Sequence, residues 1–203
     1  AGTNFVGTTD NVVVTVKMNN LTGLRIAPAT DGNDSGTVVT PNVIGGDANN
    51  NIPSTVEAST IGGGVGNSVT ASYATVPGGI GASAVELGQV AHASGSFAAA
   101  GDAQASTYIL RRTTTGNQSN QVLWLDGVSD LLNVPVGKTW SFMVYVTGRS
   151  STGFSAGYVF AGAVENVGGA TSLVAGVTTV DTSEDENAGN AAVVASDTND
   201  SLD

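Results

Sequence analysis

Cysteine is absent from the 203-residue chain, which excludes disulfide bonds, thiolate metal sites and thiol catalysis. Histidine occurs once, at His92, so one chain cannot supply a cluster of several His ligands. Only 11% of the residues are charged, against about 25% in an average soluble protein, and six are Lys or Arg. The net charge is −11, and the chain lacks the basic clusters that bind phosphate, so we expect no nucleic-acid partner.

Long apolar runs are also missing. No stretch reaches the roughly 18 apolar residues of a membrane-spanning helix, so we expect no membrane insertion. Residues 1–5 lack the basic and apolar segments of a signal peptide. We therefore expect an extracellular form of the protein to arise by processing or by release on lysis.

Glycine is abundant instead, with 28 residues, roughly twice its usual share. Val and Thr favour strands, and Gly and Asn supply turns that need a positive φ, so the composition predicts an all-β fold. Residues 12–18 and 21–27 are the first strand candidates. A turn at Asn19-Asn20 joins them, and Pro28 is expected to end the second.

A segment from residue 42 to 104 repeats an apolar anchor followed by glycine. The anchors are Ile44, Ile61, Val76 and Val90, with intervals of 17, 15 and 14 residues; 89–95 is a looser copy of the repeat, and 97–101 is the last. Such a period is typical of one coil of a β-solenoid, in which stacked coils share a thin core that neighbouring chains can thicken. We predict that these four anchors form the core of a trimer. A disordered linker is the alternative, and the regular Ile and Val argue against it.

The segment from residue 105 to the end carries most of the aromatic residues. Strand candidates are 107–114, 121–125, 138–148, 154–167 and 171–180, and residues 140–147 alternate apolar with polar. Several strands at this spacing predict an antiparallel, jelly-roll-like β-sandwich. The predicted domains are thus an N-terminal β-hairpin segment (1–41), Gly-rich β-roll repeats (42–104) and a sandwich-like domain (105–203).

Three segments resemble a known family of fibre proteins. The run 61–79, IGGGVGNSVTASYATVPGG, resembles the head repeat of trimeric autotransporter adhesins, a repeat that phage tail fibres also use. Residues 4–11, 24–26 and 41–46 resemble the segment that precedes these repeats, and 101–114 resembles the junction into a C-terminal β-domain of phage tail fibres. The resemblance implies a parallel homotrimeric β-roll fibre, located in the virion or outside the cell. Its implied partners are other virion or fibre proteins and a glycan or protein of the host surface.

The sequence offers one weak cofactor motif. Asp31, Asn33 and Ser35 match the start of a calcium-binding loop, but Asn42 stands where a bidentate Glu is expected. A plain Asx-rich turn is the favoured alternative, and we expect no cofactor. His92 is similarly expected to be a packed or turn-facing side chain. The scattered carboxylates lie beside Gly or Asn and are expected to form turns rather than a catalytic pair.

We therefore predict a non-enzymatic structural fibre of a virion that attaches to the host surface through its C-terminal domain. Tyr108, Trp124 and Trp140 are the candidates for receptor contact, because aromatic rings can stack on sugars, with core packing as the alternative. One alternative function is a bacterial cell-surface adhesin or appendage subunit, whose full gene would encode a signal peptide and a membrane anchor. Another is a polysaccharide depolymerase tailspike, which would need paired carboxylates.

Overall fold

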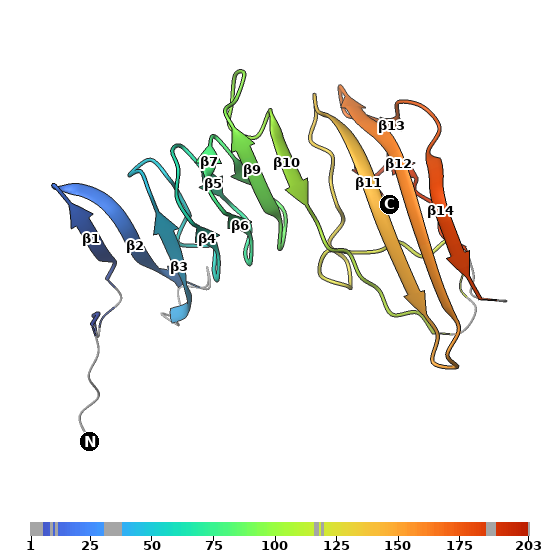
Figure 1. Ribbon diagram of the computed structural model, residues 1–203, viewed down its shortest axis with the longest axis horizontal. Helices are drawn as coiled ribbons and strands as arrows, with labels where there is room; N and C mark the ends of the chain where they lie inside the picture. The colour runs from blue at the N-terminus through green and yellow to red at the C-terminus, as the bar shows by residue number, and fades with distance from the viewer. Residues whose placement is uncertain are drawn as a thin grey trace. The chain divides into compact units, whose positions relative to one another are not determined.

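The computed structural model describes residues 6–8, 10, 12–30, 38–115, 118, 120–185 and 190–202, and of residues 30, 38 and 39 only the backbone. Within these residues every regular element is a β-strand (Figure 1), which confirms the predicted all-β class. The same residues contain no helix that could cross a membrane. The chain divides into two compact units, Ala1–Arg111 and Arg112–Asp203, called unit 1 and unit 2 below. Unit 1 thus combines the hairpin segment and the repeats of the sequence division.

Unit 1 is built mainly from one long sheet whose strands follow one another in the order β1-β2-β3-β4-β6-β9-β10 (Figure 1). The longer strands of unit 1 are β1 (Val14–Met18), β2 (Leu21–Thr30), β3 (Val38–Gly45), β9 (Val90–Ser94) and β10 (Gln104–Thr107). The two-residue strands are β4 (Thr60–Ile61), β5 (Ser68–Val69), β6 (Thr75–Val76), β7 (Gly79–Ile80) and β8 (Ser83–Ala84). β7 also pairs with β9, and β5 with β8 form a separate small sheet.

The N-terminal hairpin follows from its turn chemistry. Asn19 and Asn20 have φ values of 49° and 61°, the left-handed pair that gives a two-residue turn the twist of its strands. The expectation that Pro28 ends the second strand is wrong, because β2 continues past it. The pairing of β2 with β3 instead becomes irregular between Ala27 and Ala29, since proline has no N–H to give to the ladder.

Short parallel strands stack at a nearly constant chain interval. Ile44 pairs with Ile61 and Ile61 with Val76, which are 17 and 15 residues apart. The next interval is also 15, because Thr75 pairs with Val90. Val90 therefore continues the row of outward residues, and the following residue, Ala91, is the buried one. The sequence therefore placed the inward residue of this repeat at Val90, one position before the residue that is buried in this core.

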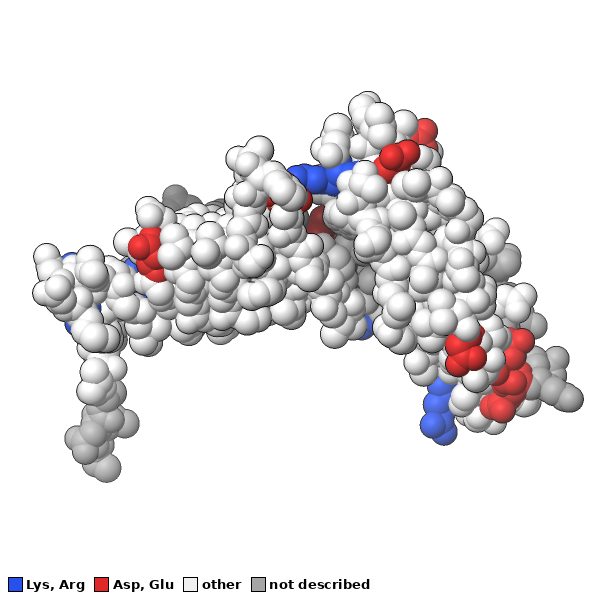
Figure 2. All heavy atoms as spheres, turned by 45° about the horizontal axis from the view of Figure 1, so that its top comes forward, with Lys and Arg blue, Asp and Glu red and all other residues white. Residues whose placement is uncertain are grey.

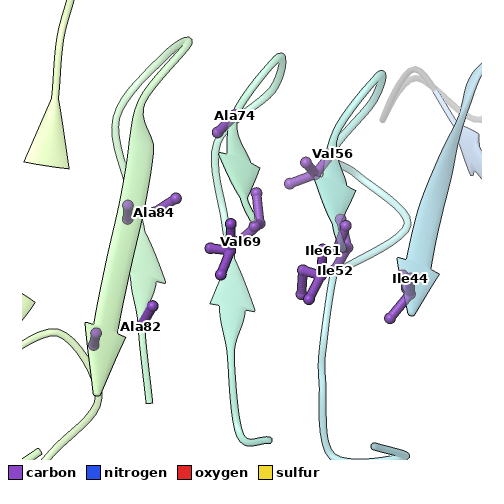
Figure 3. Packing of buried hydrophobic residues seen from close by; sticks show 11 residues of the cluster. Ile44, Ile52, Val56, Ile61, Val69, Ala74, Ala82 and Ala84 are labelled. Carbon is purple, nitrogen blue, oxygen red and sulfur yellow. The ribbon is translucent and has the colours of Figure 1, made fainter. Parts of the chain in front are cut away.

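The core of this stack is one side chain deep and lies between the β4-β6 side and the β5-β8 side of each coil (Figure 3). Close stacking restricts its corners to glycine. Gly64 has a φ of +83°, and a Cβ at this position would overlap the carbonyl oxygen of Gly79 in the next coil. The cluster of buried residues contains Ile44, Ile52, Val56, Ile61, Val69, Ala74, Val76, Ala82, Ala84, Ala91 and Ala93.

The last predicted repeat copy, 97–101, is not a further coil. It forms an exposed loop, in which Phe97 is 91% exposed. The carboxylate of Asp102 accepts hydrogen bonds from the backbone N–H groups of Phe97, Ala98 and Ala99, at 2.6–2.9 Å, and so holds the loop. β10 then returns antiparallel to β9 and is the last strand of the sheet.

Unit 2 holds an antiparallel sheet of β11 (Thr139–Arg149), β12 (Ser155–Val167), β13 (Ala170–Leu173) and β14 (Thr178–Glu184). β11 pairs along one edge of β12, while β13 and β14 share the other (Figure 1). A small pair, β15 (Ala195–Ser196) and β16 (Ser201–Leu202), completes the unit. Residues 121–125, predicted as a strand, form none and contribute the buried Leu125.

One face of this sheet is covered by its own chain. The buried cluster joins Ala156, Tyr158, Phe160 and Val164 of β12 with Val134, Val193 and Leu202 from outside the sheet. The rings of Tyr158 and Phe160 stack, with centroids 6.0 Å apart. The opposite face carries exposed side chains of β11, including Met143 and Tyr145.

Candidate association surface

A row of β-branched residues crosses the whole outer face of the long sheet of unit 1. Register pairs connect one residue from each of seven strands into this row, which we call the outer row. Adjacent strands lie about 4.8 Å apart, so its six steps span about 29 Å. The members of the outer row, in spatial order, are Val14, Ile26, Val43, Thr60, Thr75, Val90 and Thr107.

Four members of the outer row are aliphatic and three are threonine, and the row is only partly covered. Ile26, Val43 and Val90 are 40%, 38% and 42% exposed. Their neighbours in sequence point the other way, into the core of the stack, as Ile44 does in Figure 3. Residues 42–101 contain no Lys or Arg and three acidic residues, and Figure 2 shows few charged atoms over the stacked strands. The outer face therefore carries an aliphatic side chain at four of the seven levels of the row, threonine at the other three, and little charge.

The other side of each coil has different chemistry. Asn51, Ser68 and Ser83 form a row of paired positions there, so its outward residues are polar. Their neighbours Val69 and Ala84 are buried in the same core as Ile61. The two sides of a coil therefore share one core. The side of the outer row differs from the other in carrying the large, partly exposed aliphatic side chains of Ile26, Val43 and Val90, which makes it the side better suited to burial.

Buried carboxamides link each coil to the next. The Nδ2 of Asn67 donates to the carbonyl oxygens of Gly63 and Gly79, both at 3.0 Å, and its Oδ1 accepts from Ala82 N at 2.9 Å. Asn50 does the same one coil earlier, since its Oδ1 accepts from Asn67 N at 2.9 Å. These amides add hydrogen bonds to backbone groups at the glycine corners of two successive coils, and they supply acceptors for the buried N–H groups of Asn67 and Ala82. They fix the vertical register of the coils, and hence of the outer row.

A second polar column runs along the other corner of the coils. Asn42 is fully buried, donates to Val56 O at 2.6 Å and accepts from Ser59 N at 2.9 Å. The hydroxyl of Ser59 then donates to Ala71 O and accepts from Ala74 N, at 3.1 and 3.2 Å. The sequence analysis missed both columns. The interval of 17 residues from Asn50 to Asn67, equal to that from Ile44 to Ile61, is the signal that could have found one of them.

The predicted trimer-core anchors lie on two different sides of the sheet. Ile44, Ile61 and Val76 are 3%, 0% and 0% exposed and pack inside their own chain. Val90 belongs to the outer row. Any contact between copies through this sheet therefore involves the outer row and not the three inward anchors.

The three aromatic candidates for receptor contact are half-buried and have partners in their own unit. The hydroxyl of Tyr108 accepts from Gln89 Nε2 at 3.1 Å, and burial raises its pKa. The guanidinium of Arg112 lies over the ring of Trp124, 4.1 Å from its centroid. Trp140 packs against the buried cluster of unit 2. Each of the three thus has contacts within its own unit, and their contact with a receptor stays a prediction.

The remaining candidates form no chemical centre among the described residues. No group of three or more His, Asp or Glu that could hold a metal ion occurs in that part of the chain. Asp31, Asn33 and Ser35 of the calcium-loop motif lie outside the described residues. His92 is exposed, and its Nδ1 lies 3.2 Å from Gly78 O. An open hollow between β12 and β14 is lined by Glu184 and Asp185 with backbone and hydroxyl groups.

One carboxylate has a strongly shifted titration, and its role is structural. Asp126 accepts hydrogen bonds from the backbone N–H groups of Asp130, Ser129 and Val128, at 2.8–2.9 Å. These donors hold the pKa of Asp126 well below its usual range, because they stabilise the ionised form. The carboxylate therefore closes a tight turn. No family model, no curated protein and no solved structure matches this chain.

Proposed function

We propose that the protein is a non-enzymatic structural fibre of a virion that assembles as a parallel homotrimer. In this proposal the stacked coils of unit 1 form a short β-solenoid or β-roll, and unit 2 is a sandwich-like domain that contacts a glycan or protein of the host surface. The assignment to a virion rests on the resemblance of residues 61–79 to fibre repeats. The observation that carries the assembly is the outer row.

The spacing of the outer row favours a second copy of the chain as its partner. Side chains that repeat every 4.8 Å or so fit best against a surface with the same repeat. A second copy that lies parallel to the first, with its strands at the same heights, has the same repeat, because it is the same chain. A globular partner lacks that repeat. The β-branched side chains are also stiff, so little rotamer entropy is lost when they pack.

The area of the outer face determines how stable an interface it can form without other contacts. Its seven strands, which average about five residues in length, cover about 29 by 16 Å, or about 460 Å² in projection. A pair of copies would then bury about 900 Å², just below the roughly 1,000 Å² expected of a specific interface. We therefore expect two copies to associate only weakly through this face. A closed trimer should be stable, because contacts outside this face add to the interface.

Light scattering on a size-exclusion column tests the proposal with two matched double variants. Thr60→Lys with Thr75→Lys places charges in the outer row and should convert a trimer into monomers, because buried unpaired charge is costly. Ser68→Lys with Ser83→Lys places the same charges on the polar side of the same coils and should leave the trimer unchanged. A wild-type mass of one chain, or a trimer that survives Lys in the outer row, contradicts the proposal.

Attachment through unit 2 is tested separately. The wild-type protein should bind host cells and compete with the virion, and a protein truncated to residues 1–111 should not. The truncation follows the boundary between the two compact units. Equal binding by both proteins would place attachment in unit 1 and contradict this part of the proposal.

A further inference from the structure

The sheet of unit 2 has two different open edges. β11 is the last strand on one side, and its eleven residues pair only with β12 among the described strands. On the other side, β14 pairs only with β12 in the same part of the chain. An unpaired edge is a template for a strand of another chain, because its backbone donors and acceptors are free to extend the ladder. The two edges therefore offer places where copies could join.

Opposite charges occupy the two edges at the same level of the sheet. Arg149 of β11 pairs with Ser155 of β12. On the other side of Ser155, Asp185 N donates to Ser155 O at 3.0 Å, and Asp185 Oδ2 accepts from Ser155 N at 2.9 Å. Arg149 and Asp185 are both exposed, and one strand separates them. In Figure 2, acidic and basic atoms gather at one end of this unit.

The other end of the sheet repeats this arrangement. The carbonyl oxygen of Lys138, just before β11, accepts from Asn166 N at 2.9 Å. Asn166 pairs with Thr171 of β13, which donates from its N to Asp197 Oδ1 and from its Oγ1 to Asp200 Oδ1, both at 3.0 Å. The basic residue is again on the β11 side and the acidic residues on the opposite side. The sheet thus has one basic edge and one acidic edge.

We propose that the β11 edge of one copy pairs in parallel with the β14 edge of the next copy, so that the sheets of three copies join around the fibre axis. This inference rests on the proposed trimer and names its second contact. In this arrangement Arg149 lies beside Asp185 of the neighbouring copy, and opposite charges meet at the contact. Pairing β11 with β11 in antiparallel fashion would instead bring Arg149 toward Lys138, and pairing β14 with β14 would bring acidic residues together. The charges therefore select the unlike edges.

Strand direction agrees with a cyclic assembly. β11 and β14 are both antiparallel to β12, so they run in the same direction. Rotation about an axis along the strands preserves that direction, and β11 therefore meets β14 of a neighbour in parallel. Such head-to-tail contacts close into a ring when the rotation fits, which distinguishes a trimer from an open filament.

The absence of cysteine makes a cross-linking test direct. Through β12, Thr147 is level with Gly157 and Ser183, and all three lie on one face. Within one chain Thr147 and Ser183 are two strand spacings apart, about 9.6 Å, which is too far for a disulfide. In the double variant Thr147→Cys with Ser183→Cys, oxidation should therefore link copies only, and should give covalent trimers on a non-reducing gel.

The matched control is Ser141→Cys with Ser183→Cys. Ser141 lies on the same face of β11 but six residues away, about 20 Å along the strand, and should give no cross-linked trimer. Both proteins are first checked by light scattering under reducing conditions. A trimeric Thr147→Cys/Ser183→Cys protein that does not cross-link overturns the edge pairing and leaves the trimer standing. A monomeric wild-type protein overturns the trimer itself, and the edge pairing with it.

A charge reversal gives an independent reading without cysteine. Arg149→Glu places like charges at each contact and should raise the concentration at which trimers dissociate. Adding Asp185→Lys restores an opposite pair and should recover at least part of the lost association. Dissociation that is unchanged in Arg149→Glu, or that is not improved by the second substitution, contradicts the pairing.

Discussion

Removing the carboxamide of Asn67 should destabilise unit 1 by more than the lost volume of this small group alone would. Asn67→Ala leaves Ala82 N, a fully buried donor, without its acceptor, and this costs about 1–3 kcal/mol. The carbonyl of Gly79 keeps a hydrogen bond from Val65 N at 3.0 Å, so its loss is smaller. The space left by a side chain that is 1% exposed adds about 1 kcal/mol. We therefore expect a loss of about 3 kcal/mol in the free energy of unfolding.

Urea unfolding followed by far-ultraviolet circular dichroism measures this loss, at one fixed protein concentration because assembly contributes to apparent stability. The matched control is Asn49→Ala. Asn49 is exposed, and its Nδ2 donates only within its own turn, to Asp47 Oδ1 at 2.7 Å. The control should stay within about 0.5 kcal/mol of the wild type. Equal stability of the two variants would refute the argument that the buried amides hold the coils together.

A second substitution separates hydrogen bonding from volume. Asn67→Asp keeps the shape and the acceptor for Ala82 N, but an ionised carboxylate cannot donate to the two glycine carbonyls. Facing these oxygens, the new carboxyl would have a raised pKa in the folded state. Its variant should therefore be more stable near pH 4 than at pH 7, because deprotonation above the unfolded value of about 3.9 is penalised only in the folded chain. A loss of stability that does not depend on pH would point to volume alone.

Three further predictions follow from local geometry. Gly64→Ala should cost about 3 kcal/mol of unfolding free energy, from left-handed backbone strain and a backbone clash, whereas Gly66→Ala, with a φ of +63° and open space, should cost about 1 kcal/mol by urea unfolding. The hydrogen bond from Tyr158 to Glu184, at 2.6 Å, raises the pKa of Tyr158 in the folded protein. Its contribution to folding stability is therefore lost as the pH rises through that raised pKa, and Glu184→Gln should lower the pKa of Tyr158 measured by absorbance at 295 nm. Asp126 has a lowered pKa in the folded protein, so its contribution to folding stability is complete above about pH 4 and is lost in acid. Asp126→Ala should therefore weaken the fall of the unfolding free energy with decreasing pH. An unchanged fall contradicts this role of Asp126.

Local chemistry made the hairpin and the repeat predictable. Asn19-Asn20 between two Val- and Leu-containing segments specifies a two-residue turn, and the structure has both residues in the left-handed region. The intervals between Ile44, Ile61 and Val76 likewise predicted aligned strands, and these residues pair in parallel. In both places the informative residues interact with near neighbours in the chain or recur at a nearly constant interval, and both signals are visible in the sequence.

The failures arose where one apolar residue can serve two environments. Val90 was predicted as an anchor of the repeat, but Ala91 is the residue buried in this core and Val90 lies in the outer row, so its place in a trimer core stays a prediction. Residues 121–125 were predicted as a strand, but they form no strand, and Leu125 is buried. The sequence analysis assigned no role to the carboxamide of Asn67. Its partners lie in two other coils, and only the three-dimensional stack brings them together.

The small side chains in the core of unit 1 agree with the proposed assembly. The buried cluster has eleven residues, and five of them are Ala, which contribute little hydrophobic free energy. Larger apolar side chains, those of Ile26, Val43 and Val90, lie instead in the outer row, where water still reaches them. In the proposed trimer a second copy would cover that face, and part of the hydrophobic free energy of this chain would be released on association. The scarcity of charge in residues 42–101 agrees with that proposal, because a charge in the outer row would be desolvated in every copy.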